Sequence, residues 1–391
     1  MQENSSHFSP LYQEPADSIF GLQQKFISDT RKEKLDLTTG VFHNAQGQAW
    51  ILEAVKKAEL LLCKEETSKS YLPISGDSQF LKSLHSLLFT EDLPTNAIQT
   101  PGGTGALFIG GSLISKSNYK SILLPSPTWA NHASIFQHLG FTISYYPYYK
   151  EHQFVFSSLM SFLYASQEKS VILLHASCHN PSGMDFSVEE WEEILTLCKK
   201  KDLLPFFDFA YHGLKEGLEK DILPLSLCVK KGLEILVAYS CSKNFGLYKE
   251  RTGALFLLTH QKRDLIQSNI EKIARACYSN PPAHGALVVQ TILSSPSLKA
   301  LWHKEVSLLK ENIDLPRVQL IQAIREQGLE KHLTPSLVQG KGMFALLRLT
   351  PEEVEKITCE KGIYLLHNGR INLSGLSKEN IDKIVEALLC L

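Results

Sequence analysis

The chain has 391 residues, and its 40 Lys and Arg against 41 Asp and Glu leave a formal net charge of −1. With 43% hydrophobic residues it can bury a large core, which excludes a disordered chain. At this length we expect two or three domains, or one large α/β domain. A net charge near zero means that basic residues are not in overall excess, so nucleic acid is not expected as a partner.

The sequence carries no sign of export or of a membrane span. Its first seven residues have neither a basic start nor an apolar segment, so no signal peptide is expected. The uncharged stretch 121–149 is broken by prolines and polar residues, which excludes a transmembrane helix. The eight cysteines form no C-x-x-C pair, and we expect reduced thiols and a cytoplasmic location.

Four short apolar runs in the middle of the chain alternate with helix-like stretches. The runs cover residues 121–124, 170–174, 203–207 and 233–238. Their residues rarely alternate in polarity, which is typical of strands buried on both faces. Between two runs, Ser187 and Glu190 form a capping-box pattern that opens a helix. Strands that alternate with helices predict an α/β fold with a mainly parallel sheet.

A change of domain is predicted in the last quarter of the chain. A helical pattern starts at Leu298, and Pro316 is expected to break or kink it. We interpret this point as the passage from a large domain to a smaller C-terminal one. The smaller domain contains a helix that opens at Thr350, a strand-like segment at 369–373 and a last helix from about Lys378.

Chemically active side chains follow each apolar run, at the sheet edge where ligands bind in open α/β folds. We expect an aromatic ring, a His and Asn pair, an Asp with a Tyr, and a lysine to converge there. In chain order these residues are Trp129, His175, Asn180, Asp208, Tyr211 and Lys243.

Lys243 and Asp208 have the most telling surroundings. A lysine after an apolar strand can be desolvated, which lowers its pKa and makes it a nucleophile toward carbonyls; the alternative is a surface lysine. Asp208 lies in an apolar run, where a carboxylate needs a partner such as the protonated ring nitrogen of pyridoxal phosphate. The alternatives for Asp208 are a helix N-cap and a local ion pair.

A glycine-rich turn at 101–107, with the sequence PGGTGAL, leads into an apolar helix. Backbone N–H groups at the start of such a helix can bind phosphate. No strong strand pattern precedes this turn, however, and a plain turn without a ligand is an equal alternative. Arg251 and Arg370 can each clamp an oxyanion, or lie solvated at the surface.

Three further features have structural alternatives. Trp129 stacks on a flat cofactor ring or belongs to the core. His175 and His179 are four residues apart, which invites a zinc site, but Pro181 indicates a loop and no metal is expected. The segment around Arg275 forms a functional loop or a structural turn.

Taken together, these segments resemble the aspartate and aromatic aminotransferases, pyridoxal-phosphate enzymes of the aspartate aminotransferase fold. The resemblance runs from about Asp17 to the C-terminus. Its most specific stretch is SKNFGLYKER at 242–251, supported by CHNPSG at 178–183, DFAY at 208–211 and YSNPPAHG at 278–285.

The resemblance implies a role for each matching residue. Lys243 is expected to be the Schiff-base lysine and to move the proton, and Asp208 to hold the pyridine nitrogen with His175 behind it. Tyr211 and Asn180 are expected at the cofactor's 3-oxygen and Trp129 on its ring. The expected phosphate ligands are Gly103, Thr104, Ser240, Ser242, Arg251 and, from a neighbouring subunit, Tyr71. The expected substrate contacts are Gly40, Asn180 and Arg370 for the α-carboxylate, Arg275 across the dimer for a distal carboxylate, and Trp129.

The sequence departs from the family pattern at a few positions. Cys241 replaces an aromatic residue before the serine–lysine pair, and Cys277 replaces an asparagine after the distal arginine. Ala49 and Ser70 lie where the family lines its substrate pocket, so they affect the expected side-chain preference. None of these changes removes a catalytic group.

The resemblance implies a homodimeric aminotransferase that moves the amino group of aspartate or aromatic amino acids to 2-oxoglutarate. It also implies a division into an N-terminal arm with part of the small domain (1–45), a large cofactor-binding domain (46–310) and a small domain (311–391). The alternatives are a pyridoxal-phosphate lyase or cyclase, and a non-catalytic cofactor-binding regulator. A nicotinamide dehydrogenase is disfavoured because no G-x-G-x-x-G follows a strand.

Overall fold

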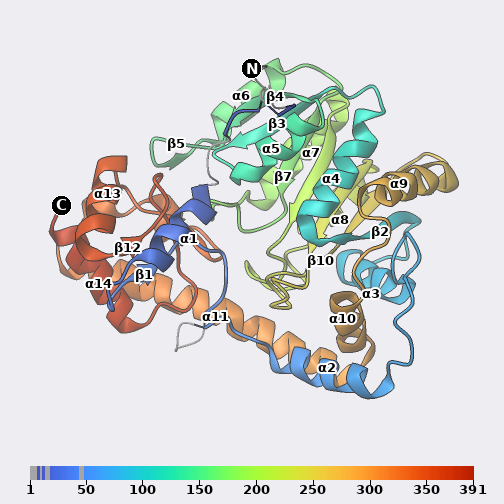
Figure 1. Ribbon diagram of the computed structural model, residues 1–391. Coiled ribbons are helices and arrows are strands. Elements are labelled where there is room, and N and C mark those ends of the chain that lie inside the picture. The colour runs from blue at the N-terminus through green and yellow to red at the C-terminus, as the bar shows by residue number, and fades with distance from the viewer. Residues whose placement is uncertain (1–6, 9–10, 14–17, 44–47) are drawn as a thin grey trace, which may run out of the picture.

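A seven-stranded sheet lies at the centre of the larger part of the molecule (Figure 1), in a computed structural model that describes residues 7–8, 11–13, 18–43 and 48–391. The strand order is β2-β10-β9-β8-β7-β3-β4. Strands β9, β8, β7, β3 and β4 pair in parallel, whereas β10 is antiparallel to both of its neighbours. The α/β class and the mainly parallel sheet are therefore confirmed. The bounds are β2 (Thr95–Pro101), β3 (Ser121–Ser126), β4 (Thr142–Pro147), β7 (Val171–His175), β8 (Leu204–Phe209), β9 (Ile235–Ser240) and β10 (Thr252–Leu258).

Helices cover both faces of this sheet, which explains why its strands are apolar throughout. Phe206 and Phe207 are consecutive and fully buried, yet they belong to two different hydrophobic clusters on opposite faces. One face packs against α4 (Gly102–Ser115), α5 (Ala130–His138) and α9 (Arg263–Cys277). The other packs against α6 (Phe156–Ala165), α7 (Val188–Lys201) and α8 (Leu223–Lys231). Helix α7 begins with the predicted capping box of Ser187 and Glu190.

Of the break or kink predicted at Pro316, the break is wrong, because α11 (Pro296–Glu326) runs continuously through this residue. Proline removes one N–H from the helix, and this leaves the carbonyl four residues earlier without its usual donor. Here the backbone N–H of Gly375 donates to that carbonyl, on Asn312, over 3.4 Å. A partner from another segment therefore replaces the missing bond, and the helix continues.

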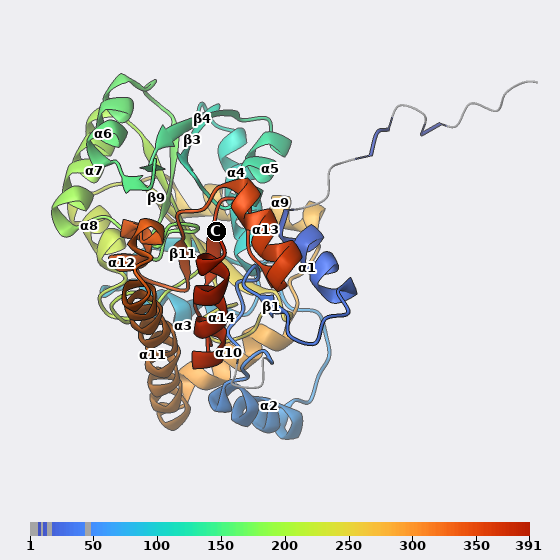
Figure 2. The ribbon, with the colours of Figure 1, turned by 90° about the vertical axis from the view of Figure 1, so that its left-hand side faces the viewer.

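The C-terminal elements gather with α1 (Ser18–Ser28) at one side of the molecule, as both ribbon views show (Figures 1 and 2). Two short sheets pair β1 (Leu35–Asp36) with β12 (Ile363–Tyr364), and β11 (Phe344–Leu346) with β13 (Arg370–Asn372). Along α11, Ile313 belongs to the large core and Leu320 to a separate cluster of this C-terminal part. The domain limits given above stay a prediction, and the part of 1–45 at residues 1–6, 9–10, 14–17 and 44–45 lies outside the described residues.

The remaining elements pack around these two parts. They are α2 (Glu53–Glu65), α3 (Ser78–Leu88), β5 (Tyr149–Lys150), β6 (Gln153–Phe154), α10 (His284–Ser294), a 3-10 turn (Glu330–His332), α12 (Pro335–Val338), α13 (Pro351–Lys361) and α14 (Lys378–Leu389). Within the described ranges, no helix combines the length and the apolar character that crossing a membrane requires.

Candidate active site

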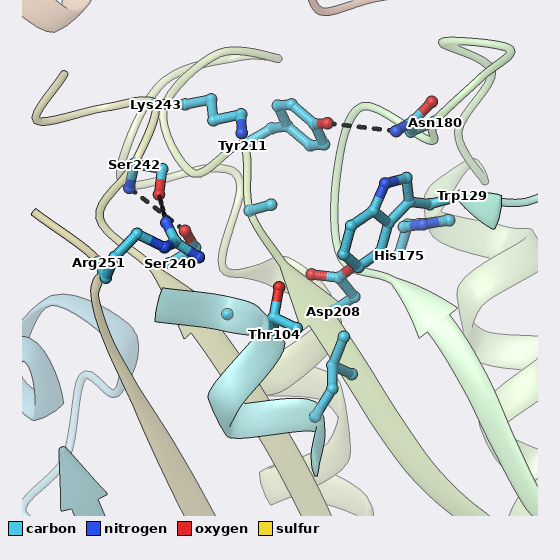
Figure 3. A pocket seen from close by; sticks show the side chains of 13 residues that line it. Thr104, Trp129, His175, Asn180, Asp208, Tyr211, Ser240, Ser242, Lys243 and Arg251 are labelled. Atoms are coloured by element: carbon cyan, nitrogen blue, oxygen red, sulfur yellow. Dashed lines mark hydrogen bonds between the residues drawn. The ribbon is translucent and has the colours of Figure 1, made fainter. Parts of the chain in front are cut away.

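The carboxyl ends of β7, β8 and β9 and the start of α4 enclose a cavity of about 620 Å³, including its open mouth (Figure 3). Most of the residues predicted to form the site line this one cavity. They are Gly103, Thr104, Trp129, His175, Asn180, Asp208, Tyr211, Ser240, Ser242, Lys243 and Arg251. The sheet edge therefore brings together residues that lie up to 148 positions apart in the chain (251 − 103).

Asp208 is the penultimate residue of β8, lines the cavity and is 7% exposed. His132, on α5, donates from Nε2 to Asp208 Oδ2 over 2.9 Å, and its Nδ1 lies 2.8 Å from Thr128 Oγ1. Burial alone would raise the pKa of Asp208, but the hydrogen bond from His132 and the nearby charge of Lys243 more than offset it, so the pKa is lowered. Asp208 is thus an ionised acceptor that faces the cavity.

His132 is the residue that sequence reasoning missed. We expected His175 behind Asp208, and it does line the cavity, but neither of its ring nitrogens has a hydrogen-bond partner. Burial lowers the pKa of His175 to about 3, so it is neutral. The available signal was the position of His132 only three residues after Trp129, which precedes α5, and the two rings lie edge to face with their centres 5.2 Å apart.

Lys243 follows β9 and points into the cavity (Figure 3). Burial, with a contribution from Arg251, lowers the pKa of its amine to about 8. The Nζ atom lies 5.9 Å from the ring centre of Tyr211 and 5.6 Å from that of Tyr248. A desolvated amine of this kind is a nucleophile near neutral pH.

Tyr211 and Asn180 line the cavity, and Arg370 is bonded to Asn180. Arg370 donates from Nη1 to Asn180 Oδ1 over 3.0 Å, and Asn180 donates from Nδ2 toward the hydroxyl of Tyr211 over 3.5 Å. Arg370 also donates to the carbonyl of Thr38 and lies over the ring of Phe344, 4.1 Å from its centre. Phe344 in turn contacts Gly40, where a Cβ would approach its Cζ to 2.9 Å. Gly40 does not itself line the cavity.

The start of α4 and Arg251 form an anion cradle. Strand β2 ends at Pro101 and α4 begins at Gly102, so a strand does precede the glycine turn although the sequence showed no strong strand pattern there. The strand is hard to recognise because its sequence, TNAIQTP, is half polar. A Cβ on Gly102 would lie 2.6 Å from Arg251 Nη2, and one on Gly103 would lie 3.1 Å from Ser240 Cβ. Glycine at position 102 lets the cationic side chain of Arg251 approach the helix N-terminus, and glycine at position 103 leaves room for Ser240.

The cavity thus has an ionised carboxylate at one end, a cationic cradle at the other and a lysine above the space between them (Figure 3). This arrangement fits a flat ring with a basic nitrogen and a phosphate group. Trp129 is partly exposed at the edge of the same space. Ser242 and Arg251 are already in contact, at 3.4 Å between Oγ and Nη1. The residues present could therefore hold pyridoxal phosphate.

Four predicted residues do not line the cavity, and two of them, Tyr71 and Arg275, lie on the surface of the chain; the other two are Gly40 and Arg370. Tyr71 is 92% exposed, and Arg275 is exposed near the end of α9. Asn280 connects their segments, because it donates from Nδ2 to the carbonyl of Leu72 over 2.7 Å and accepts from Arg275 Nη1 over 3.4 Å. Neither residue contributes to the cavity of its own chain.

A comparison with protein families matches residues 32–388 to the family described as aminotransferase class I and II. The chain belongs to the class I and II aminotransferase family. Among curated relatives, this aminotransferase is 38% identical to an aromatic-amino-acid aminotransferase of Pseudomonas aeruginosa, over 98% of each chain. It is 37% identical to an aspartate aminotransferase of Escherichia coli, over 98% of this chain and 99% of that one.

Solved structures agree with this assignment. One of them is an aromatic-amino-acid aminotransferase of Burkholderia pseudomallei that is covalently bound to pyridoxal phosphate. It superposes on the present chain with a TM-score of 0.94. The two chains are 33% identical, and 99% of each is covered. The fold and the family expected from the sequence are therefore confirmed. The role of each single residue stays a prediction.

Proposed function

We propose that this aminotransferase moves the amino group of aspartate, tyrosine or phenylalanine to 2-oxoglutarate, with pyridoxal phosphate as its cofactor. The observation that carries the proposal is the placement of Lys243, with its lowered pKa, in the same cavity as the ionised Asp208 and the cradle of Arg251. The names of the relatives support both aspartate and aromatic substrates.

The side chains divide the work of holding and orienting the cofactor. Asp208 would hold the protonated ring nitrogen, and Gly103, Thr104, Ser240, Ser242 and Arg251 would hold the phosphate. When bound, pyridoxal phosphate supplies an electron sink that acidifies the Cα proton of an amino acid. Lys243 then moves that proton as the neutral amine, which its lowered pKa makes available near neutral pH.

Arg370 would bind the α-carboxylate of the substrate. Its guanidinium is 2% exposed and is oriented by Asn180, Thr38 and the ring of Phe344. A planar, oriented guanidinium suits a carboxylate better than a lysine would. Because Arg370 contacts Asn180, a carboxylate bound by Arg370 would lie beside the amide that faces Tyr211.

We also propose a homodimer in which Tyr71 and Arg275 complete the partner's cavity. Both side chains are exposed on their own chain, and Asn280 holds their segments together. An arginine brought in this way would bind the distal carboxylate of aspartate. The compartment we propose is the cytoplasm, where all eight cysteines remain free thiols as in the structure.

The deciding experiment is a comparison of kcat/KM for aspartate, tyrosine and phenylalanine with 2-oxoglutarate. Oxo-acid formation that requires 2-oxoglutarate and shows ping-pong kinetics supports transfer. Release of a substrate fragment without an acceptor would identify a lyase. Cofactor binding without turnover of any of the three would identify a regulator.

A further inference from the structure

A buried chain of side-chain hydrogen bonds runs behind the candidate active site and connects the two loops that carry Lys243 and Tyr211. Asn244 donates from Nδ2 to the hydroxyl oxygen of Tyr239 over 2.8 Å. The same hydroxyl lies 3.0 Å from Nδ1 of His212, whose Nε2 lies 2.8 Å from the carbonyl of Leu218. The side chains of Tyr239, Asn244 and His212 are all fully buried.

The direction of each bond in this chain is fixed by chemistry. A carbonyl oxygen only accepts, so His212 carries its proton on Nε2 and donates it to Leu218. Burial lowers the pKa of His212 to about 4, and its Nδ1 is therefore an unprotonated acceptor. Tyr239 must donate its one proton to that nitrogen, which leaves its oxygen to accept from Asn244. The hydroxyl of Tyr239 is thus the only link between the two loops in this chain of bonds.

The two ends of the chain of bonds are covalent neighbours of the reacting groups. His212 follows Tyr211 directly, and Asn244 follows Lys243 directly. The lysine loop is further fixed to α11, since Trp302 donates from Nε1 to the carbonyl of Asn244 over 2.8 Å. The ring of Trp302 also stacks on Phe245, with centres 4.4 Å apart and planes 7° from parallel. A shift of either loop must therefore break or stretch a bond to Tyr239.

We propose that Tyr239 is a positioning residue, which sets the placement of Lys243 relative to Tyr211 through Asn244 and His212. The inference rests on the proposed roles of Lys243 and Tyr211. It does not follow from the family resemblance, which assigned roles to Ser240, Ser242 and Lys243 in this segment but none to Tyr239. Without the hydroxyl, a buried N–H of Asn244 and a buried nitrogen of His212 lose their partner, and both loops gain freedom.

The test compares Tyr239→Phe with a matched control, Tyr146→Phe. Tyr146 is also a fully buried tyrosine on a strand of the same sheet, and its hydroxyl donates to the carbonyl of Leu173 over 2.8 Å. Both variants lose one buried hydroxyl, so both should lower the melting temperature of the protein. Only Tyr239→Phe should alter the surroundings of Lys243.

The first readout needs no turnover. Cofactor-free protein is labelled with acetic anhydride at a series of pH values, and the modification of Lys243 is quantified by mass spectrometry. In Tyr239→Phe the midpoint of the pH profile of Lys243 labelling should rise by about half a pH unit or more. Looser packing admits water around the amine and raises its pKa toward the ordinary value of a lysine. In Tyr146→Phe the midpoint should stay within about 0.1 unit of the parent value, since a remote site leaves the desolvation of Lys243 unchanged.

The second readout is steady-state kinetics of the cofactor-loaded enzyme. Tyr239→Phe should lower kcat about tenfold and change KM less than about twofold, because misplacement of a reacting group acts on the chemical step. Equal labelling midpoints and equal kcat in the two variants would overturn the proposal. A labelling shift in a protein that shows no transamination would retain the network and reject the proposed function.

A second pair of variants decides the matter if Tyr239→Phe does not fold. Glutamine at position 212, in His212→Gln, offers an oxygen that can accept from the hydroxyl of Tyr239 and an amide group that can donate to the carbonyl of Leu218. Leucine at this position, in His212→Leu, offers neither group. His212→Gln should keep the parent labelling midpoint, and His212→Leu should show the raised one. The same midpoint in both variants would overturn the proposal.

Discussion

The Nε2 atom of His132 lies 2.9 Å from a carboxylate oxygen of Asp208, and both residues are buried at the edge of the sheet. The bond joins α5 to the end of β8 across 76 positions of the chain. It lowers the pKa of a carboxyl group whose pKa burial would raise. A histidine from a distant helix therefore favours the negative charge at this end of the cavity.

This charge predicts a large difference between two substitutions. Asp208→Asn should lower kcat by about 100-fold or more, because a neutral amide loses a charge-assisted hydrogen bond and cannot hold a ring nitrogen protonated. Tyr211→Phe should lower kcat by about tenfold or less, since it removes only a hydroxyl bonded weakly to Asn180. Steady-state kinetics of both variants measure this. Rate losses of similar size would contradict the roles given to the two residues.

Lys243 should be the only lysine that becomes attached to the cofactor. Its desolvated amine follows β9 inside the cavity, beside the phosphate cradle. The purified protein should be yellow, and borohydride reduction followed by peptide mapping should place the cofactor on a peptide containing Lys243. Lys243→Ala should abolish both the attachment and nearly all turnover. Attachment to a different lysine would show that the site has been misassigned.

The buried amine should also cost the cofactor-free protein stability in a pH-dependent way. Its pKa falls from 10.5 to about 8 on folding, so between these values the unfolded chain binds a proton that the folded chain lacks. The cost is complete below pH 8 and disappears as the pH rises to 10.5. At pH 7, Lys243→Met should raise the free energy of unfolding by about 2 kcal/mol, given the partial exposure of the amine to the cavity.

Urea unfolding of cofactor-free parent and Lys243→Met at pH 7 and pH 10 measures this effect. The added apolar contacts of methionine contribute equally at both pH values. The difference in stability should therefore shrink toward pH 10. A difference that stays constant would mean that Lys243 keeps an ordinary pKa in the folded chain.

Mixed dimers test whether Arg275 acts across the subunit interface. Homodimers of Lys243→Ala and of Arg275→Ala should both be poor with aspartate. In a hybrid, one site combines the intact lysine of one chain with the intact arginine of the other, and the second site carries both lesions. Random reassortment should restore about a quarter of the aspartate turnover of the parent, since about half of the dimers are hybrids with one complete site each.

Phenylalanine provides the control for this mixing experiment. It has no distal carboxylate, so Arg275→Ala alone should retain much of its phenylalanine turnover. Native mass spectrometry verifies that hybrids have formed. If verified hybrids show no recovery with aspartate, Arg275 acts within its own chain, and the shared site is excluded.

The parallel arrangement of the central strands and the convergence of the site were predictable from local pattern. The apolar runs that precede Trp129, His175, Asp208 and Lys243 predict parallel strands, and parallel strands place their carboxyl ends at one edge. Ser187 and Glu190 marked the start of α7 because a capping box is satisfied within a single turn. The half-polar β2 and the uninterrupted α11 were not predictable, since each depends on partners far along the chain.

By itself, the sequence determined the fold class, the family and the set of side chains at the sheet edge, because these follow from local periodicity and from motifs of fixed spacing. Only the tertiary structure decided which partner each side chain has. It paired Asp208 with His132, joined Arg370 to Asn180, and left Tyr71 and Arg275 outside the cavity of their own chain. It also placed the hydroxyl of Tyr239 between the loops of Lys243 and Tyr211. Hydrogen bonds and desolvation depend on distance in space, and segments far apart in the chain acquire that distance only when they pack together.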